Sequence, residues 1–236
     1  MTPNNYFSFK QFTIYQDKAA FKVGTDGVLL GAVADISNAG SILDIGSGSG
    51  LIALMLAQRT EAVITAIEPD RDSYLQTLEN VDKSKWKDRI KVIHTDLQNF
   101  NPGEKKFDLI VTNPPYFIKS LKSPDERKSV ARHNDSLTSA DILEGTIRLM
   151  NENGRLQLIL PYAEGNIFIA EAAGYGLYCN SIIKIKPLPS SEIRRLILSF
   201  SKTRKDPVEK FLTIEHGRHE FTEEYKELTK EFYLKF

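Results

Sequence analysis

The 236-residue sequence contains a single cysteine, Cys179, and therefore cannot form an intramolecular disulfide. Such sparse cysteine usage is typical of proteins in a reducing compartment. No apolar run approaches the roughly 18 residues that a membrane helix needs. The N-terminus lacks the charged start and apolar core of a signal peptide. We expect a soluble cytoplasmic protein in which Cys179 is a small packing residue of a strand.

The sequence also lacks net charge, internal repeats and long linkers. Its 31 basic residues are balanced by 31 acidic ones, so any nucleic-acid partner must be bound by a local patch. His216 and His219 lack the Cys or carboxylate partners of a metal site, and we expect a surface turn there and no bound metal. We expect a monomer with one domain over residues 1–236, made of an N-terminal cap (1–38) and a core (39–236).

From Ser41 onward, strand-like and helix-like segments alternate, which predicts an α/β domain whose largely parallel sheet is covered on both faces. The last two strands lack a long helix between them and are candidates for an antiparallel pair. We expect Asp70 and Ser139 to cap two of the helices. The predicted strands are 41–45, 62–67, 90–94, 107–112, 155–160, 178–185 and 195–201, and the predicted helices are 51–59, 71–82, 140–150 and 162–173.

A cofactor site is predicted where three of these strands end. The first strand runs into an acidic and glycine-rich loop, whose glycines allow tight turning and close approach to a ligand. Glu68 ends the second strand and suits the hydroxyls of a ribose. Asp96 follows the third and could accept from an adenine amino group. An adenosine with a cationic amino acid tail, such as S-adenosylmethionine, fits all three; the alternative is a simple turn with helix-capping acids. The loop residues are Asp44, Gly46, Gly48 and Gly50.

The fourth strand ends in the most informative motif, Asn113-Pro114-Pro115-Tyr116. Two prolines cannot continue a sheet ladder, because neither has an N–H group to donate. The Asn113 side-chain oxygen and the Pro114 carbonyl could then accept both hydrogens of a planar amino group while Tyr116 stacks on its ring. This arrangement would aim the nitrogen lone pair at a methyl donor. The alternative is a proline-stiffened loop without chemistry.

Together these motifs resemble the class I S-adenosylmethionine-dependent methyltransferases, and within them the amino methyltransferases that carry [ND]PP[YF]. The likeness extends over residues 22 to about 200, with the motifs in the family's order. It implies a Rossmann-like seven-stranded mixed sheet with helices on both faces and the last strand antiparallel. It also assigns catalysis to the NPPY residues, and cofactor binding to the glycine loop, Glu68, Asp96 and Asn113.

Among these enzymes the sequence is most similar to the bacterial tRNA1(Val) adenine-37 N6-methyltransferases, in segments 21–32 and 193–200. The resemblance implies a tRNA substrate and a cofactor pocket lined by Lys22, Thr25 and Asp26, although Asp26 could equally cap a helix. The alternatives are a glutamine N5-methyltransferase of release factors and an rRNA guanine-N2 methyltransferase. A non-enzymatic RNA-binding module is a third possibility, which the intact Asn113 disfavours.

RNA contacts are predicted in the basic loop after NPPY, where cations beside the site suit phosphate groups. Asp125, Glu126 and Asp135 offset much of this charge, so a solvated surface loop is the alternative. A second basic cluster follows the last predicted strand, at Lys202, Arg204 and Lys205. The candidate loop residues are Lys119, Lys122, Arg127, Lys128 and Arg132, with His133 beside them.

Overall fold

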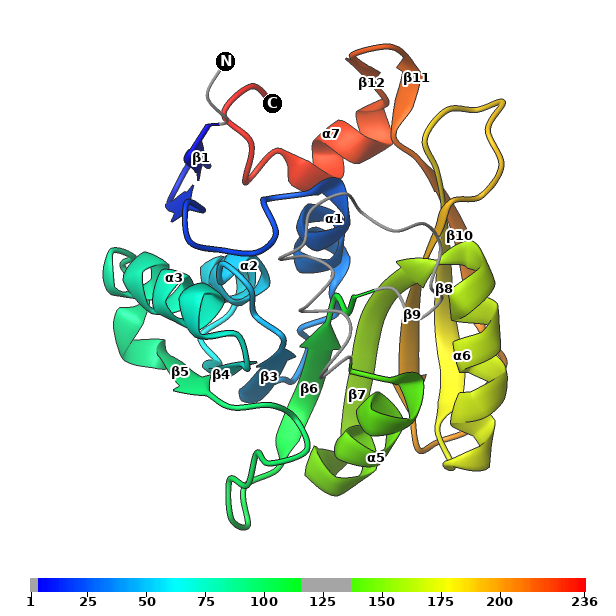
Figure 1. Cartoon of the computed structure of the whole chain (residues 1–236). Coiled ribbons are helices and arrows are strands. Elements are labelled where there is room, and N and C mark those ends of the chain that lie inside the picture. Colours follow the sequence, from blue (N-terminus) through cyan, green and yellow to red (C-terminus); the bar gives the residue numbers. More distant parts are fainter. Residues whose placement is uncertain (1–3, 116–136) are drawn as a thin grey trace.

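The fold is built around one eight-stranded sheet, seen in the computed structural model of residues 4–115 and 137–236 (Figure 1). The strand order is β10-β8-β9-β7-β6-β3-β4-β5. Strands β7, β6, β3, β4 and β5 are parallel to one another, and β9 runs antiparallel to both of its neighbours. The strands are β3 (Ser41–Ile45), β4 (Val63–Glu68), β5 (Ile90–His94), β6 (Phe107–Thr112), β7 (Met150–Pro161), β8 (Tyr178–Lys186), β9 (Arg195–Ser201) and β10 (Val208–Thr213).

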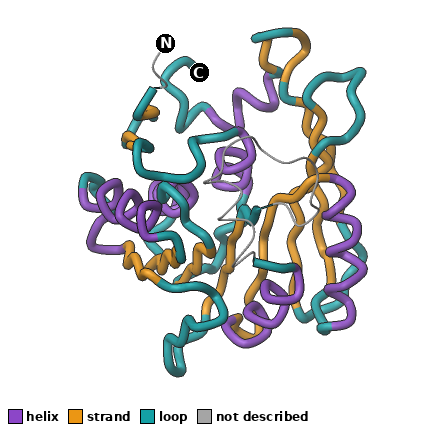
Figure 2. The backbone as a smooth tube through the Cα atoms, viewed as in Figure 1, coloured by secondary structure: helices purple, strands orange, loops and turns teal. Residues whose placement is uncertain are grey.

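Helices cover both faces of the sheet, because successive strand residues alternate between two apolar cores (Figure 2). In β6, Leu109 and Val111 point into one core while Ile110 points into the other. The first core holds α1 (Thr25–Val33), α2 (Leu51–Arg59) and part of α3 (Arg71–Asp82), and the second holds α5 (Ser139–Leu149) and α6 (Tyr162–Gly174). A short 3₁₀ turn, η1 (Lys87–Arg89), precedes β5.

The fold class predicted from the sequence is confirmed. The number of strands and the cap of one helix differ from the prediction. The expected seven strands are joined by an eighth, β10, which pairs in parallel with β8 at the sheet edge. Asp70 caps α3 by accepting from the Ser73 N–H, as predicted. Thr138 rather than Ser139 caps α5, because the Asp141 side chain accepts in return from the Thr138 N–H and completes a capping box.

Both ends of the chain lie over the edge at which the parallel strands end (Figure 1). The N-terminal part forms a hairpin of β1 (Tyr6–Ser8) and β2 (Thr13–Tyr15), and the C-terminal part forms β11 (Glu215–Gly217), β12 (Glu220–Phe221) and α7 (Glu223–Thr229). Lys10 ties the two together: its Nζ donates to the main-chain oxygens of Lys230 and Phe236, each at 2.6 Å. The covering of this edge therefore includes residues beyond 213, which the sequence did not predict.

Trp86, which precedes η1, is buried and packs edge-to-face with Phe12. Two smaller expectations, for Cys179 and for membrane-spanning helices, can also be compared with the structure. Cys179 is half-buried in β8, where burial raises the pKa of its thiol to about 11. Across residues 4–115 and 137–236, no helix combines the length and the apolar character needed to span a bilayer.

Candidate active site

The loop after β3 contains Gly46, Gly48 and Gly50 and leaves open space over its backbone at Gly46 and Gly48; we call it the glycine cradle. Gly46, Gly48 and Gly50 all have positive φ, at 71°, 60° and 81°, a conformation that other residues adopt at a cost. A Cβ at Gly46 or Gly48 would meet no atom of the described residues within 4 Å. The loop is held from behind by α3, since Thr77 Oγ1 donates to the Gly48 carbonyl at 2.7 Å and Asn80 Nδ2 donates to the Ser49 carbonyl at 2.8 Å. A ligand can therefore approach the backbone of a rigid loop.

Glu68 at the end of β4 is bound to this loop. Its Oε2 accepts from the Gly48 N–H at 2.8 Å, and its Oε1 accepts from the Asp70 N–H at 2.9 Å. Burial raises the pKa of Glu68, although both of these hydrogen bonds oppose that shift. Each carboxylate oxygen can accept a second hydrogen bond. Glu68 is thus fixed beside the cradle with acceptor capacity to spare.

Asp44 lies beneath the loop and is fully buried. Its Oδ2 accepts from the Ala53 N–H at 3.1 Å, whereas its Oδ1 has no hydrogen-bond partner in the described part of the chain. Burial raises the pKa of Asp44 to about 7, and the charge of Glu68 contributes to the same shift. An unpartnered acceptor in a buried carboxyl group favours a cationic or hydrogen-donating ligand.

Asp96 follows β5, and both of its carboxylate oxygens already accept hydrogen bonds from Asn99. Its Oδ1 accepts from the Asn99 N–H at 2.7 Å, and its Oδ2 accepts from Asn99 Nδ2 at 2.9 Å. His94, at the end of the same strand, bonds through Nε2 to the Pro69 carbonyl at 3.0 Å and stacks on Tyr74. Asp96 therefore stands at the predicted edge, with a turn-forming role that the sequence did not assign to it.

Asn113 is the first residue after β6 and is half-buried at the same edge as the glycine loop. The two strand ends are joined directly, because Thr112 Oγ1 donates to the Ile45 carbonyl at 3.0 Å. Pro114 is buried and Pro115 is exposed. Tyr116 lies outside the described residues, as does the whole candidate RNA-binding set Lys119, Lys122, Arg127, Lys128 and Arg132.

The start of α1 forms the wall opposite Asn113. A Cβ built on Gly27 would lie 3.9 Å from Asn113 Nδ2, so the backbone of α1 reaches the motif. Asp26 accepts from Arg195 Nε at 2.7 Å, which ties α1 to the start of β9. Gly24, not Asp26, is the N-cap residue of this helix. Thr25 is exposed at its first position, and the exposed Lys22 places Nζ 3.5 Å from the Asn4 carbonyl.

The second basic cluster is not part of this edge. β9 runs antiparallel to β7, so residues after Ser201 lie at the end of the sheet opposite Asn113. There Lys202 pairs with Glu152 at 3.0 Å, and the Arg204 guanidinium lies 5.8 Å from the centre of the Tyr178 ring. Within residues 4–115 and 137–236, no group of three or more His, Cys, Asp or Glu side chains could hold a metal ion.

Sequence reasoning missed Arg195, Thr77 and Asn80. Arg195 lies 169 positions from Asp26, and the pairing of β9 with β7 and β8 brings the two side chains together. Thr77 and Asn80 are three residues apart on α3, a spacing that places them on one helix face. That periodicity was visible in the sequence, but it did not show that this face supports the glycine loop.

Comparison with known proteins identifies the family of this chain. The methyltransferase small domain family matches residues 17–161. A tRNA1(Val) (adenine(37)-N6)-methyltransferase of Bacteroides thetaiotaomicron is 45% identical over 233 residues, covering 98% of each chain. One of the same name from Flavobacterium johnsoniae is 48% identical, covering 97% of this chain and 99% of its own. The chain belongs to this methyltransferase family.

The fold of this methyltransferase also has solved counterparts. A predicted O-methyltransferase from Agrobacterium tumefaciens superimposes with a TM-score of 0.66 at 22% identity, covering 88% of this chain and 96% of its own. The resemblance to the methyltransferases that was stated from the motifs is confirmed. The roles of individual side chains stay predictions.

Proposed function

We propose that this methyltransferase transfers a methyl group from S-adenosylmethionine to the exocyclic N6 of adenine 37 in tRNA1(Val). The observation that carries the proposal is that Asn113 and the glycine loop lie at the same edge of the sheet, where Thr112 donates a hydrogen bond to the Ile45 carbonyl. The names of its full-length relatives support the choice of nucleotide. We further propose that it works as a cytoplasmic monomer.

The donor side of the site fits an adenosine that carries a cationic amino acid tail. The unpartnered Oδ1 of Asp44 would accept from the ammonium group, and Glu68 would accept from the ribose hydroxyls. The open space over Gly46 and Gly48 leaves room for the ligand against the backbone. Asp96 would accept from the adenine amino group only if a carboxylate oxygen takes that bond in addition to the one from Asn99. When bound, the sulfonium supplies an electrophilic methyl group.

On the acceptor side, this chain would grip the amino group of the substrate. The Asn113 side-chain oxygen and the Pro114 carbonyl would accept its two hydrogens, which localises the nitrogen lone pair toward the methyl donor. Transfer would form the N–C bond as the S–C bond of the donor breaks, with the S–C electron pair left on sulfur and one proton of the amino group released to water. Tyr116 would stack on the adenine ring, a contact worth about 1–3 kcal/mol for a nucleobase. Positioning and fixed dipoles provide the catalysis.

A substrate panel tests the proposal. The protein is incubated with S-adenosylmethionine labelled in its methyl group and, in parallel, with unmodified tRNA, rRNA, a release factor or DNA. We expect label in tRNA alone, recovered as N6-methyladenosine at position 37. Label confined to the release factor would indicate glutamine methylation, label in rRNA guanine would indicate the guanine-N2 alternative, and no transfer would favour the non-enzymatic module. Each of the last three results would contradict the proposal.

A further inference from the structure

Asn80 joins the N-terminal part of the chain to the glycine cradle. Its side chain is buried on α3, and its amide group uses both of its hydrogens and its oxygen. Nδ2 donates to the main-chain oxygens of Tyr15 and Ser49, each at 2.8 Å, and Oδ1 accepts from the Tyr15 N–H at 2.9 Å. Tyr15 ends β2, and Ser49 lies between Gly48 and Gly50 of the cradle. One amide group therefore fixes two separate segments of main chain.

The segment after β2 runs along the same face of α3. The Lys18 N–H donates to Gln76 Oε1 at 2.9 Å. The Ala20 N–H donates to Ser73 Oγ at 3.3 Å. Ser73, Gln76 and Asn80 recur at intervals of three and four residues, which places them on one side of the helix. The N-terminal segment is thus attached to α3 by three of its main-chain N–H groups, and Asn80 alone among these three side chains also bonds to the cradle in the described structure.

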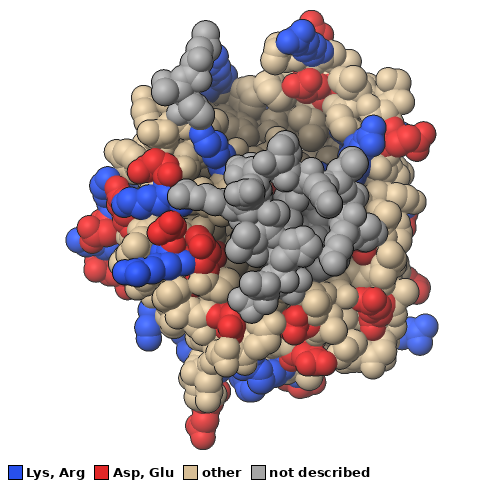
Figure 3. Space-filling view, in the orientation of Figure 1, with Lys and Arg blue, Asp and Glu red and all other residues tan. Residues whose placement is uncertain are grey.

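The charged side chains over this contact reach the solvent. Lys18 Nζ lies 2.6 Å from Glu79 Oε2, and Lys83 Nζ lies 2.7 Å from the other oxygen of the same carboxylate. Figure 3 shows basic and acidic side chains intermingled on the side of the molecule where α3 lies. Exposed ion pairs of this kind contribute little to stability. The buried hydrogen bonds of Asn80 are therefore the stronger contact between the N-terminal segment and α3.

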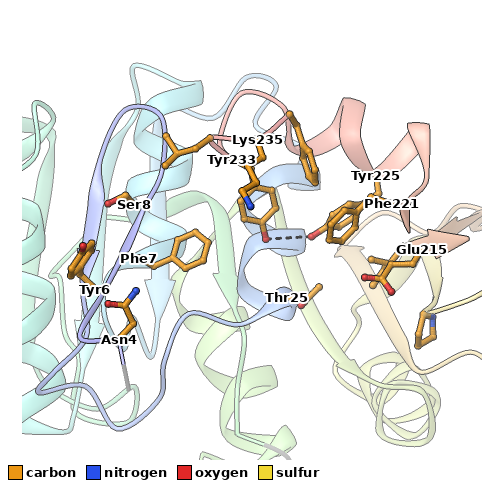
Figure 4. Close-up of a pocket in the computed structure, with 14 residues that line it drawn as sticks. Asn4, Tyr6, Phe7, Ser8, Thr25, Glu215, Phe221, Tyr225, Tyr233 and Lys235 are labelled. Atoms are coloured by element: carbon orange, nitrogen blue, oxygen red, sulfur yellow. Dashed lines mark hydrogen bonds between the residues drawn. The ribbon is translucent and has the colours of Figure 1, made fainter. Parts of the chain in front are cut away.

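On its other side, the β1–β2 hairpin meets the C-terminal segment around a hollow. The ring centre of Phe7 lies 6.0 Å from that of Tyr233, whose hydroxyl lies 3.3 Å from the hydroxyl of Tyr225 (Figure 4). A cavity of about 880 Å³ lies between these walls. Side chains that border a void lose packing contacts on that side. Docking of the hairpin therefore depends the more on its contacts with α3.

We propose that Asn80 is a positioning residue that couples docking of the N-terminal hairpin to the shape of the glycine cradle, and through the cradle to donor affinity. The inference rests on the proposed function, because it takes the cradle as the site that binds S-adenosylmethionine. Asn80 acts through the Ser49 carbonyl, whose position sets the backbone between Gly48 and Gly50. Such coupling is reciprocal: a docked hairpin favours the donor, and a bound donor favours the docked hairpin.

The first test compares Asn80→Ala with Gln157→Ala. Gln157 is the matched control, because its buried amide group also grips the main chain of one distant residue: Oε1 accepts from the Asp35 N–H at 2.9 Å, and Nε2 donates to the Asp35 carbonyl at 3.2 Å. Asp35 follows the C-terminal end of α1, whereas Gly27, near Asn113, lies at the start of that helix. Both variants should melt at a lower temperature than the wild type.

Only Asn80→Ala should also change the donor site. We expect its Kd for S-adenosylmethionine, measured by isothermal titration well below the melting temperature, to rise by at least about 5-fold, the lower end of typical coupling between two sites. The kcat at saturating donor and the KM for tRNA should stay near the wild-type values. A purely structural role would lower the melting temperature and leave this Kd unchanged. That result would overturn the inference, as would an equal rise of the Kd in Gln157→Ala.

The second test uses the wild type alone and so does not depend on the folding of a variant. Hydrogen exchange of single amides is measured with and without saturating S-adenosylmethionine. The Tyr15 N–H, held by Asn80, should exchange more slowly with the donor bound. It should slow by a larger factor than the Asp35 N–H, which Gln157 holds in the same way and which reports general stabilisation by the ligand. Equal slowing of the two amides, or none at Tyr15, would contradict the coupling.

The two tests also separate this inference from the proposed function. If the wild type methylates adenine 37 while donor affinity and hairpin docking prove independent, the inference fails and the proposed function stands alone. If the wild type binds no S-adenosylmethionine, both fail.

Discussion

The two ends of the central sheet use carboxyl groups in opposite ways. At the end where the parallel strands begin, Asp108 accepts from the Gly40 and Ser41 N–H groups, from Ser41 Oγ and from Asn151 Nδ2. Partial burial by itself raises the pKa of Asp108, but these hydrogen bonds together lower it. At the end where the strands finish, Asp44 keeps one oxygen unpartnered in the described structure, and its pKa is raised to about 7.

This contrast separates stability from function. A carboxylate whose hydrogen bonds are all made locks β3, β6 and β7 together and gains nothing from a ligand. A buried carboxyl group with a missing partner weakens the apoprotein and gains when a ligand supplies the missing donor or charge. We predict that residues of the first kind hold the fold and that residues of the second kind bind the donor.

The largest expected effect is at the stabilising end. Asp108→Ala removes the acceptor of two main-chain N–H groups and should lower the free energy of unfolding by about 2–3 kcal/mol. The measurement is urea denaturation, with the affinity for S-adenosylmethionine recorded under folding conditions. A folded Asp108→Ala protein that has lost this affinity would break the distinction between the two ends.

Asp44→Asn should raise the free energy of unfolding of the apoprotein, whereas Asp108→Ala should lower it. Folding raises the pKa of Asp44 above its ordinary value of 3.8, so the folded protein holds this proton more tightly than the unfolded chain does. Stability from this group is therefore present at low pH and is lost as the pH rises toward about 7. At pH 8 Asp44→Asn should raise the free energy of unfolding of the apoprotein by on the order of 1–3 kcal/mol.

The same substitution should weaken cofactor binding. Between pH 6 and 7.5 the wild type should bind S-adenosylmethionine more tightly as Asp44 ionises, whereas Asp44→Asn should show little of this dependence. Isothermal titration across this range, combined with thermal unfolding of the apoprotein, measures both effects. Unchanged cofactor affinity in Asp44→Asn would contradict the role that we assign to Asp44.

The smallest predicted effect is a difference in donor affinity between alanine substitutions at two glycines of similar φ. Gly48 in the cradle and Gly103 in the loop before β6 have φ of 60° and 70°, and a Cβ at either would meet no described atom within 4 Å. Substitution by Ala should therefore cost each fold about 1 kcal/mol of stability. Only Gly48→Ala should also weaken binding of S-adenosylmethionine, as calorimetry would show. Equal affinities in the two variants would remove Gly48 from the proposed cofactor site.

Much of this arrangement was predictable because it depends on local chemistry. The glycine loop requires positive φ at its glycines, and two successive prolines cannot continue the ladder of a central strand. Alternation of apolar strands and helices then brings Asp44, Glu68 and Asn113 to one edge. These features lie within about 70 residues of one another, and the sequence pattern fixes their relative placement.

The rest depends on contacts that the local sequence does not encode. β10 reads as a mostly exposed segment and becomes a strand only by pairing with β8. Thr138 and Ser139 are both suitable caps, and the choice falls on Thr138 because Asp141 is three positions later. The cavity between the two chain ends is lined by residues as far apart in sequence as Phe7 and Tyr233, and no sequence period connects them.

The central claim is that Asn113 acts on the substrate amino group and not on the fold or the donor. Its most direct test is single-turnover methyl transfer to unmodified tRNA by Asn113→Ala, with the Kd for S-adenosylmethionine measured on the same preparation. We predict that transfer falls by about 100-fold or more, as for loss of an oriented catalytic dipole, while donor affinity changes little. Transfer at the wild-type rate would contradict the account.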